Sequence, residues 1–314
     1  MISIIIRTLN EEKYLSECLD RICGQVIDDD LEIILVDSGS TDETLSIARA
    51  HDLIIREIKK EDFTFGRSLN LGCQASQGSI LVFLSAHCIP YDRHWLRNLV
   101  APLKSKIANY SYGRQIAREG VSKFSEGRIF AKYYPEHSSI PQAGYFCNNA
   151  NSAILRETWM TYKFDESLSG LEDMELAKRI VENKGAIAYV ADAVVEHIHE
   201  ESWRRIKIRF EREALALGSI EPRLSLQLTD AIGMCFVSIL KDFKERSAFN
   251  FTNIHEIIAY RACQYFGSYI GSSLSKSRSK TIKRSYFYPE IDKNPVTLEV
   301  VNEGRSFVTN EGKQ

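Results

Sequence analysis

One stretch decides the fold that this sequence predicts: Gly78-Ser79-Ile80-Leu81-Val82-Phe83-Leu84-Ser85-Ala86-His87-Cys88-Ile89-Pro90. Five apolar residues, Ile80 to Leu84, lie between a glycine and a polar break that leads to a proline, which is typical of a short strand buried on both faces. Such a strand belongs in the middle of a parallel sheet. Because ligands bind at the carboxyl ends of strands in open α/β sheets, Ser85 and His87 are candidate site residues. The alternative for His87 is a lone histidine that is satisfied at a strand end.

The residues before this stretch alternate between strand and helix patterns, which predicts a parallel sheet covered on both faces by helices. Asn10 is a good N-cap for a helix with Leu15, Leu19 and Ile22 at helical spacing. Ser40 and Glu43 have the spacing of a capping box for the next helix. The expected strands are Ile2 to Ile6, Leu31 to Val36 and Leu53 to Glu57. Residues 63–72 are expected to lead into a short helix before the central strand.

Length and composition limit the possible classes of protein. A chain of 314 residues suggests one large or two smaller domains, and 40 basic against 42 acidic residues point to no nucleic-acid partner. Seven cysteines without a CxxC pair are typical of a reducing compartment, so we expect a cytoplasmic protein. The stretch Ala231 to Leu240 is far shorter than the ~20 residues of a spanning helix, and we expect neither a transmembrane segment nor a signal peptide.

Polar residues follow the first two predicted strands, where a nucleoside is expected. No GxGxxG follows the first strand and no GxxxxGK[ST] occurs, which disfavours dehydrogenases and P-loop proteins. Carboxylates and hydroxyls in these loops can hydrogen-bond a base and a ribose. The residues concerned are Thr8, Asn10, Glu11, Asp37, Ser38 and Asp42. The alternative is that Asp37 to Asp42 forms only a turn and a helix cap, which explains Ser40 better than Asp37.

A second group of polar residues lies in the middle of the chain. Ser169 and Glu172 again match a capping box, whereas Asp173 is not needed for the cap and is a candidate general base. His197 and His199 point to the same side of an extended segment, because side chains in a strand repeat every second residue. Together with His87 they can supply a divalent metal site; two exposed histidines without a ligand are the alternative.

Several segments carry a resemblance. The opening Ser3-Ile4-Ile5-Ile6-Arg7-Thr8-Leu9-Asn10-Glu11-Glu12, the turn Val36-Asp37-Ser38-Gly39-Ser40-Thr41-Asp42 and the pair Glu172-Asp173 resemble the inverting family 2 glycosyltransferases. Other segments are most similar to bacterial rhamnosyltransferase-like enzymes that build surface polysaccharides: Phe65-Gly66-Arg67-Ser68-Leu69-Asn70-Leu71-Gly72, Gly113-Arg114-Gln115, Asn149-Ala150-Asn151-Ser152 and His197-Ile198-His199. The resemblance covers about residues 1 to 218. It implies the α/β GT-A fold, a Rossmann-like, mostly parallel sheet, here with a C-terminal helical extension.

The resemblance also implies a reaction. A sugar would move from a UDP-, dTDP- or GDP-linked donor to a growing glycan, free or lipid-linked, of a capsule, an O-antigen or a similar polysaccharide, with inversion at the anomeric carbon. Asp173 would be the base, with Glu172 beside it. The implied donor contacts are Thr8, Asn10, Glu11, Asp37, Ser38, Arg67, Asn70, Ser85 and His87, and the implied acceptor contacts are Asn149 and Asn151. Family members usually carry an Asp-x-Asp, or at least one aspartate, where this chain has Ser85-Ala86-His87. Dependence on Mn²⁺ or Mg²⁺ through His87, His197 and His199 therefore stays open.

The chain changes character after Glu200. An amphipathic helix from Trp203 is followed by a second helix with Leu228 and Ile232, and by a third over roughly Ile254 to Ser273. A basic run, Lys276 to Arg284, is either a solvated tail or a contact with acidic lipids on the inner face of a membrane. We expect a glycosyltransferase domain at residues 1–218 and a helical region with a polar tail at 219–314. Two other functions remain, a sugar-phosphate nucleotidyltransferase and an inactive GT-A module that binds glycans.

Overall fold

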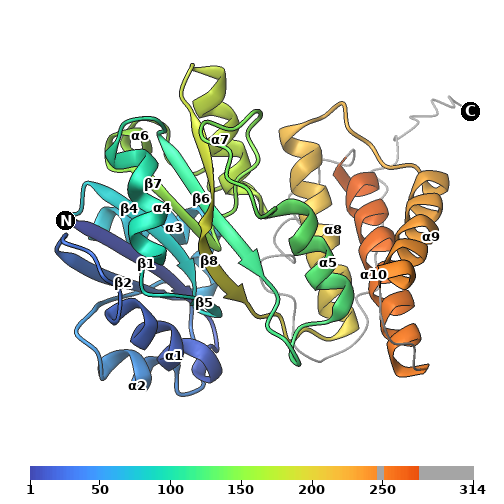
Figure 1. The fold of residues 1–314 in the computed structure, drawn as a ribbon, viewed down its shortest axis with the longest axis horizontal. Helices are drawn as coiled ribbons and strands as arrows, with labels where there is room; N and C mark the ends of the chain where they lie inside the picture. Colours follow the sequence, from blue (N-terminus) through green and yellow to red (C-terminus); the bar gives the residue numbers. More distant parts are fainter. Residues whose placement is uncertain (246–250, 276–314) are drawn as a thin grey trace, which may run out of the picture.

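The computed structural model describes residues 1–245 and 251–275, and its centre is an eight-stranded mixed sheet (Figure 1). The strand order is β3-β2-β1-β4-β7-β6-β8-β5. The strands are β1 Ile2–Thr8, β2 Leu31–Asp37, β3 Ile54–Glu57, β4 Ile80–Ser85, β5 Cys88–Pro90, β6 Tyr110–Ile116, β7 Asn151–Leu155 and β8 Ile187–His197. The helices are α1 Glu12–Cys23, α2 Thr44–Arg49, η1 Lys60–Asp62, α3 Phe65–Ala75, α4 Trp95–Lys104, α5 Phe124–Tyr133, α6 Arg156–Tyr162, α7 Glu172–Glu182, α8 Trp203–Ile220, α9 Leu228–Glu245 and α10 Phe251–Ser275.

The predicted strands and the central position of β4 are confirmed. β1 pairs in parallel with β2 and β4, and β2 pairs in parallel with β3. The other neighbour of β4 is β7, which is antiparallel to both β4 and β6, so β4 lies at the border between parallel and antiparallel pairing. The parallel register sets Thr8 beside Asp37 and Arg7 beside Ser85. The carboxyl ends of these three strands therefore share one edge of the sheet.

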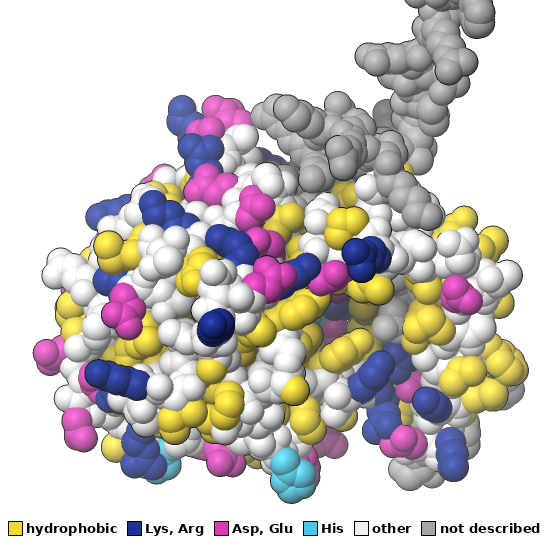
Figure 2. Space-filling model, turned by 90° about the horizontal axis from the view of Figure 1, so that it is seen from above, with side chains coloured by type: hydrophobic (Ala, Val, Ile, Leu, Met, Phe, Trp, Pro, Cys, Tyr) yellow, Lys and Arg dark blue, Asp and Glu magenta, His cyan; other side chains and the backbone are white. Residues whose placement is uncertain are grey.

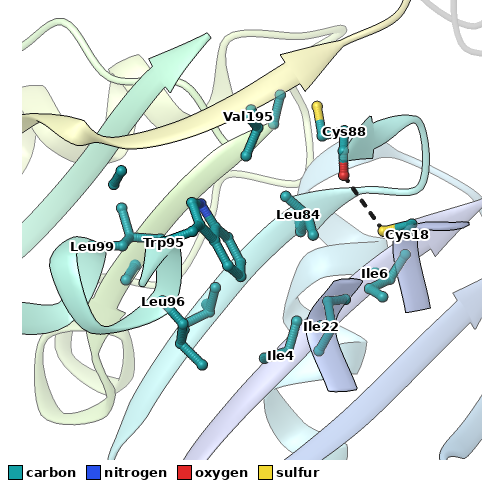
Figure 3. Packing of buried hydrophobic residues seen from close by; sticks show 14 of the residues in the cluster. Ile4, Ile6, Cys18, Ile22, Leu84, Cys88, Trp95, Leu96, Leu99 and Val195 are labelled. Carbon is teal, nitrogen blue, oxygen red and sulfur yellow. Dashed lines mark hydrogen bonds between the residues drawn. The ribbon is translucent and has the colours of Figure 1, made fainter. Parts of the chain in front are cut away.

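Both faces of β4 are buried because each is covered by a separate apolar cluster. On one face, α1 and α4 pack over the strands, and Trp95 of α4 is fully buried (Figure 3). The Trp95 indole donates to Oδ1 of Asn151, 2.9 Å away, which satisfies its polar atom inside the core. Side chains in this layer include Ile4, Ile6, Cys18, Ile22, Leu84, Leu96, Leu99 and Val195.

The predicted helix caps at Asn10 and Ser40 are wrong. Helix α1 begins at Glu12, and the φ angle of Asn10 is 57°, a left-handed conformation that asparagine tolerates. Its Oδ1 accepts instead from the backbone N–H of Thr41, at 2.8 Å. Helix α2 begins at Thr44 without a side-chain cap, because the Ser40 hydroxyl donates to the carboxylate of Asp37. Both side chains thus tie the loops after β1 and β2 together.

The C-terminal helices lie beside the sheet as a separate layer (Figure 1). α8 and α10 pack closely along each other, because Gly267 and Gly271 of α10 have no side chains. A side chain at either position would collide with the backbone of α8. Helix α8, which the sequence boundary at residue 218 assigns to the first domain, therefore contacts the helices of the second. Within the described part of the chain, each helix is too short or too polar to span a bilayer. The basic run Lys276 to Arg284 and the polar tail lie outside the described residues.

Candidate active site

Several segments meet at the edge where β1, β2 and β4 end. The β4–β5 turn carries His87, whose carbonyl accepts from the backbone N–H of Ile198 at 3.1 Å, just beyond the end of β8. The loop before β7 meets the start of α7, where the backbone N–H of Asn149 donates to Oδ2 of Asp173 at 2.8 Å. Residues far apart in the sequence are thus held together by hydrogen bonds from backbone N–H groups.

Asp173 is a buried carboxylate held by backbone groups. It is 6% exposed, and its Oδ1 accepts from the N–H of Met174 at 2.7 Å. Burial, and then the neighbouring Glu172 carboxylate, raise the pKa of Asp173 to about 7. A carboxylate with such a pKa near neutrality suits proton transfer.

Glu172 pairs with an arginine and does not cap α7, so the predicted capping box with Ser169 is wrong. The residue before the helix, Leu171, has a φ angle of 56° and provides no side-chain cap, and the Ser169 hydroxyl is buried without a hydrogen bond. Oε1 of Glu172 lies 3.4 Å from Nη1 of Arg7. Arg7 also donates to the carbonyl of Phe65 at 3.3 Å. The ion pair joins the end of β1 to the start of α7.

Arg212 of α8 is a site residue that the sequence analysis missed. Its guanidinium carbon lies 4.5 Å from the ring centroid of Phe65, and Arg7 contacts the same ring at 5.1 Å. Its Nε is buried without a hydrogen bond. Burial lowers the pKa of Arg212. Two guanidinium groups therefore flank one aromatic ring beside the Glu172–Asp173 pair, which is a suitable place for an anion.

The three predicted histidines do come together. Ring centroids are separated by 5.3 Å between His87 and His197, 5.6 Å between His87 and His199, and 4.1 Å between His197 and His199. One ligand atom from each lies within 4.8 Å of the others. The prediction that these residues form a cluster is confirmed.

Each histidine is oriented through the same ring atom. Nδ1 of His87 lies 2.9 Å from Glu11, that of His197 lies 2.6 Å from Gln115, and that of His199 lies 2.6 Å from Glu126. Since the partner oxygens accept, each neutral ring carries its proton on Nδ1 and has its lone pair on Nε2. This is the usual arrangement of histidine ligands and their supporting groups, so the cluster fits a divalent metal.

The electrostatic surroundings of the histidines differ. Burial disfavours the charged form of His87, but the Glu11 carboxylate outweighs burial and raises the pKa of this imidazole. Burial, and then the neighbouring His199 and His87, lower the pKa of His197 well below its usual range. Another acidic group, Glu126, His199 and Glu201, fits a metal poorly, because the Arg209 guanidinium binds both carboxylates, at 2.7 and 2.8 Å.

The residues after β1 and β2 are largely committed to their own turn. Thr8, Asp37 and Ser38 are at most 3% exposed. The Asp37 carboxylate accepts from the Thr8 hydroxyl, from the N–H groups of Gly39 and Ser40, each at 2.9 Å, and from the Ser40 hydroxyl. Because these four bonds use the whole acceptor capacity of a carboxylate, Asp37 organises the loop on which a nucleoside would lie.

Two other predicted donor contacts, Arg67 and Asn70, lie at a cavity away from the carboxylate pair. A cavity of about 460 Å³ at the end of β3 is lined by Arg67 and Asn70, but by neither the carboxylate pair nor the histidines. Arg67 is half exposed and close to Asp62. The Asn70 amide is satisfied by Trp159, Phe164 and Glu166, so this side chain fixes the loop after α6.

The predicted acceptor contacts differ in position. Asn151 has no exposed surface, and its amide is bound to Trp95 and to the carbonyls of Arg114 and Ala193, so the prediction that it faces an acceptor is wrong. Asn149 is also buried, but it is next to the base: its N–H binds Asp173, and its own amide nitrogen has no hydrogen-bond partner.

Comparison with known proteins now gives the family. The model of glycosyl transferase family 2 matches residues 3–160, half of the chain. The chain belongs to glycosyl transferase family 2. One relative of this family 2 chain is the O-antigen chain rhamnosyltransferase RfbN of Salmonella typhimurium, 27% identical over 63% of this chain and 66% of RfbN. Another is a PGL/p-HBAD biosynthesis glycosyltransferase of Mycobacterium bovis, 42% identical over 38% of this chain and 48% of the relative. The chain thus spans less than two thirds of the length of either.

Solved structures confirm the predicted GT-A fold of this family 2 chain. The mannosyltransferase PcManGT from Pyrobaculum calidifontis, in complex with GDP-Man and Mn²⁺, has a TM-score of 0.62 at 20% identity and covers 88% of each chain. Glucosyl-3-phosphoglycerate synthase from Mycobacterium tuberculosis, in complex with Mn²⁺, UDP-glucose and phosphoglyceric acid, has a TM-score of 0.52 at 24% identity. The match covers 70% of this chain and 79% of the synthase. At these identities the likeness is one of fold.

Proposed function

We propose that this family 2 chain is an inverting glycosyltransferase that moves a sugar from a nucleoside-diphosphate donor to a glycan acceptor. The observation that carries the proposal is the buried Glu172–Asp173 pair at the edge where β1, β2 and β4 end. Asp173 is held by two backbone N–H groups and has a pKa near neutrality. A sugar hydroxyl is a weak nucleophile, and a fixed base of this kind is what its activation requires.

In the proposed step, Asp173 accepts the proton of an acceptor hydroxyl while the oxygen attacks the anomeric carbon. One C–O bond forms to the acceptor, and the C–O bond to the nucleoside diphosphate breaks on the opposite face, so the anomeric configuration inverts. The proton stays on Asp173, whose raised pKa allows it to remain there until the product leaves. The N–H groups of Asn149 and Met174 keep the carboxylate aimed during the transfer.

Positive groups near the pair would offset the charge that develops on the leaving diphosphate. Arg7 and Arg212 supply two guanidinium groups at the Phe65 ring, and His87 is held beside Glu11. His87, His197 and His199 would hold a divalent metal through Nε2. A bound metal would neutralise diphosphate oxygens as a Lewis acid. The Mn²⁺ in the two solved relatives supports this assignment, although their ligand sets belong to those proteins.

The relatives support a biological setting for this reaction. The rhamnosyltransferases RfbN and WbaN act on the O-antigen chain, which supports a rhamnosyl or related hexosyl donor and a surface polysaccharide as product. A lipid-linked acceptor would place the reaction at the cytoplasmic face of the inner membrane. GDP- and UDP-linked sugars in the solved neighbours support a nucleoside-diphosphate donor without selecting the base.

A panel of UDP-, dTDP- and GDP-sugars, each tested for protection against thermal unfolding, identifies the donor. A ligand at about 100 times its Kd adds about 2.7 kcal/mol of stability. Transfer to a glycan acceptor is then followed by NMR, with Asp173→Asn as the inactive control. A product with inverted anomeric configuration is expected. Retention would rule out the single displacement, and binding without transfer would favour the inactive module.

The alternative sugar-phosphate nucleotidyltransferase predicts a different product. Such an enzyme releases pyrophosphate from a nucleoside triphosphate and a sugar phosphate. The chain lacks a glycine-rich, lysine-bearing first loop, and its family is that of glycosyl transferases. A pyrophosphate assay with nucleoside triphosphates and sugar phosphates separates the two reactions.

A further inference from the structure

Helix α9 carries a continuous apolar surface on its outer side. Six large apolar side chains of this helix are between 42% and 61% exposed: Leu228, Ile232, Met234, Phe236, Val237 and Leu240. No acidic or basic residue occurs between Asp230 and Lys241. Figure 2 shows hydrophobic side chains gathered at the end of the molecule where the C-terminal helices lie. Clusters of this kind mark surfaces that contact a partner or a membrane.

The inner side of α9 buries the small side chains of Ala231 and Cys235 and, nearer the end of the helix, a charged one. Asp242 is 2% exposed and binds the Arg261 guanidinium of α10 through two bonds of 2.7 and 2.8 Å. It also accepts from the hydroxyl of Ser125 on α5, at 2.7 Å. Nearer the middle of the helix, Ser238 and Tyr265 share a hydrogen bond of 2.6 Å.

This distribution differs from that of a surface helix in water. Such a helix normally turns its apolar side inward and its charged side outward. In α9 an ion pair lies inside, and the side chains of Phe236 and Ile232 are more than half exposed. The outer side of α9 is therefore suited to an apolar environment beyond the chain.

The charged residues around this surface indicate which kind of partner it binds. Lys241 and Lys244 are exposed at the end of α9, together with Glu245, whose carboxylate pairs with Arg128. The start of α9 is close to the end of α10, because the N–H of Leu226 donates to Ser272 at 2.8 Å. Directly after α10 the sequence carries five basic residues in 276–284 and no acidic residue before Glu290. Apolar side chains flanked by cations suit the interface of an anionic bilayer, whereas a second copy would bring like charges together.

We propose that the outer face of α9 docks on an anionic lipid bilayer, with Phe236 and Ile232 at its centre. The inference deepens the membrane contact of the proposed function, and it concerns a surface far from the Glu172–Asp173 pair. Docking there would hold the active site close to a lipid-linked acceptor.

Sedimentation of the full chain with vesicles tests the proposal. Vesicles of phosphatidylcholine with phosphatidylglycerol should bind the protein, and the double variant Ile232→Gln/Phe236→Gln should lower the affinity about tenfold or more. Met160→Gln is the control, because Met160 on α6 is as exposed as Phe236, at 61%. Binding by the wild type should persist in part at 1 M salt, where a Debye length of ~3 Å removes most surface electrostatics.

Two results would overturn the proposal. The first is a double variant that binds vesicles as the wild type does, or a wild type that does not bind them. The second is a wild-type dimer in light scattering that the double variant abolishes, which would assign the face to a second copy. Calorimetry on the same samples measures donor affinity, which separates this surface from the reaction. A wild-type protein that binds no nucleotide-sugar donor would count against the proposed function and not against docking.

Discussion

At the scale of single residues, Asp173 carries the strongest prediction. Asp173→Asn keeps the shape of the side chain but cannot accept a proton, so turnover should fall by about 10² to 10⁴ while donor affinity stays near the wild-type value. Single-turnover rates and calorimetry measure the two quantities. An asparagine variant with near-native turnover would move the role of base to Glu172 or Glu175.

The pKa of about 7 for Asp173 predicts opposite pH trends for activity and stability. Activity should rise with pH through about 7, because the base must be deprotonated. In the unfolded chain the pKa is about 3.9, so the native state holds an extra proton between pH 4 and 7 and loses stability as pH rises through this window. Asp173→Asn removes that loss. In denaturant unfolding, the free energy of unfolding of the variant should therefore increase relative to that of the wild type from pH 4 to pH 8. A difference in this free energy that does not change with pH would contradict the raised pKa of Asp173.

Glu172 should be coupled to Arg7. Glu172→Gln weakens the charged hydrogen bond across the 3.4 Å contact, which is expected to lower the free energy of unfolding by about 1–3 kcal/mol. In a double-mutant cycle, the variant with both Arg7→Gln and Glu172→Gln should lose less free energy of unfolding than the sum of the losses in the two single variants. Additive effects would contradict a direct interaction between Glu172 and Arg7.

At the scale of elements, the turn after β2 tests how a nucleoside would be held. Asp37→Ala removes four hydrogen bonds from the turn, so both the melting temperature and the donor affinity should fall. Ser40→Ala removes only one of these side-chain bonds and serves as the milder control, with a cost of about 1 kcal/mol. If Asp37→Ala lost donor affinity at an unchanged melting temperature, the carboxylate would contact the nucleoside directly.

The histidine cluster joins the β4–β5 turn to the end of β8, and metal binding there can be measured without activity. Mn²⁺ should bind the wild type in calorimetry, and His199→Ala should weaken binding by more than tenfold. His94→Ala, at an exposed histidine before α4, is the control. Gln115→Ala should weaken Mn²⁺ binding about tenfold by releasing the ring of His197. Equal Mn²⁺ affinity in all four proteins would remove the metal from the cluster.

The elements themselves were largely predictable from the sequence, whereas their ends and contacts were not. Runs such as Ile80 to Leu84 identify buried strands because burial on both faces requires continuous apolar residues. The capping box failed at Ser40 because its hydroxyl donates to Asp37, three residues earlier, and at Glu172 because its carboxylate pairs with Arg7 of β1. Partners separated by more than a hundred residues become visible only in three dimensions.

The lack of three-dimensional information also explains which site residues could be predicted from the sequence. The three histidines were predictable as a set because a strand places alternate residues on one side and β4 ends nearby. Asn151 was misassigned because an asparagine in a motif does not show whether its amide faces a cleft or the core. Arg212 was missed because arginines on an amphipathic helix are usually solvated, and only the three-dimensional fold brings this one to Phe65 at the start of α3.

At the scale of the whole molecule, Arg212 connects the helical layer to the catalytic edge, because it lies on α8 but packs beside Gly170 and over Phe65. If it contacts the leaving diphosphate, Arg212→Gln should lower turnover by about 10² to 10³, the range for one group that stabilises developing charge. The variant should also weaken binding of the nucleoside diphosphate and leave binding of the nucleoside alone unchanged. Arg205→Gln, an exposed arginine on the same helix, is the matched control and should match the wild type in both measurements. An Arg212→Gln protein with native diphosphate affinity and turnover would show that α8 supports the active site through packing alone.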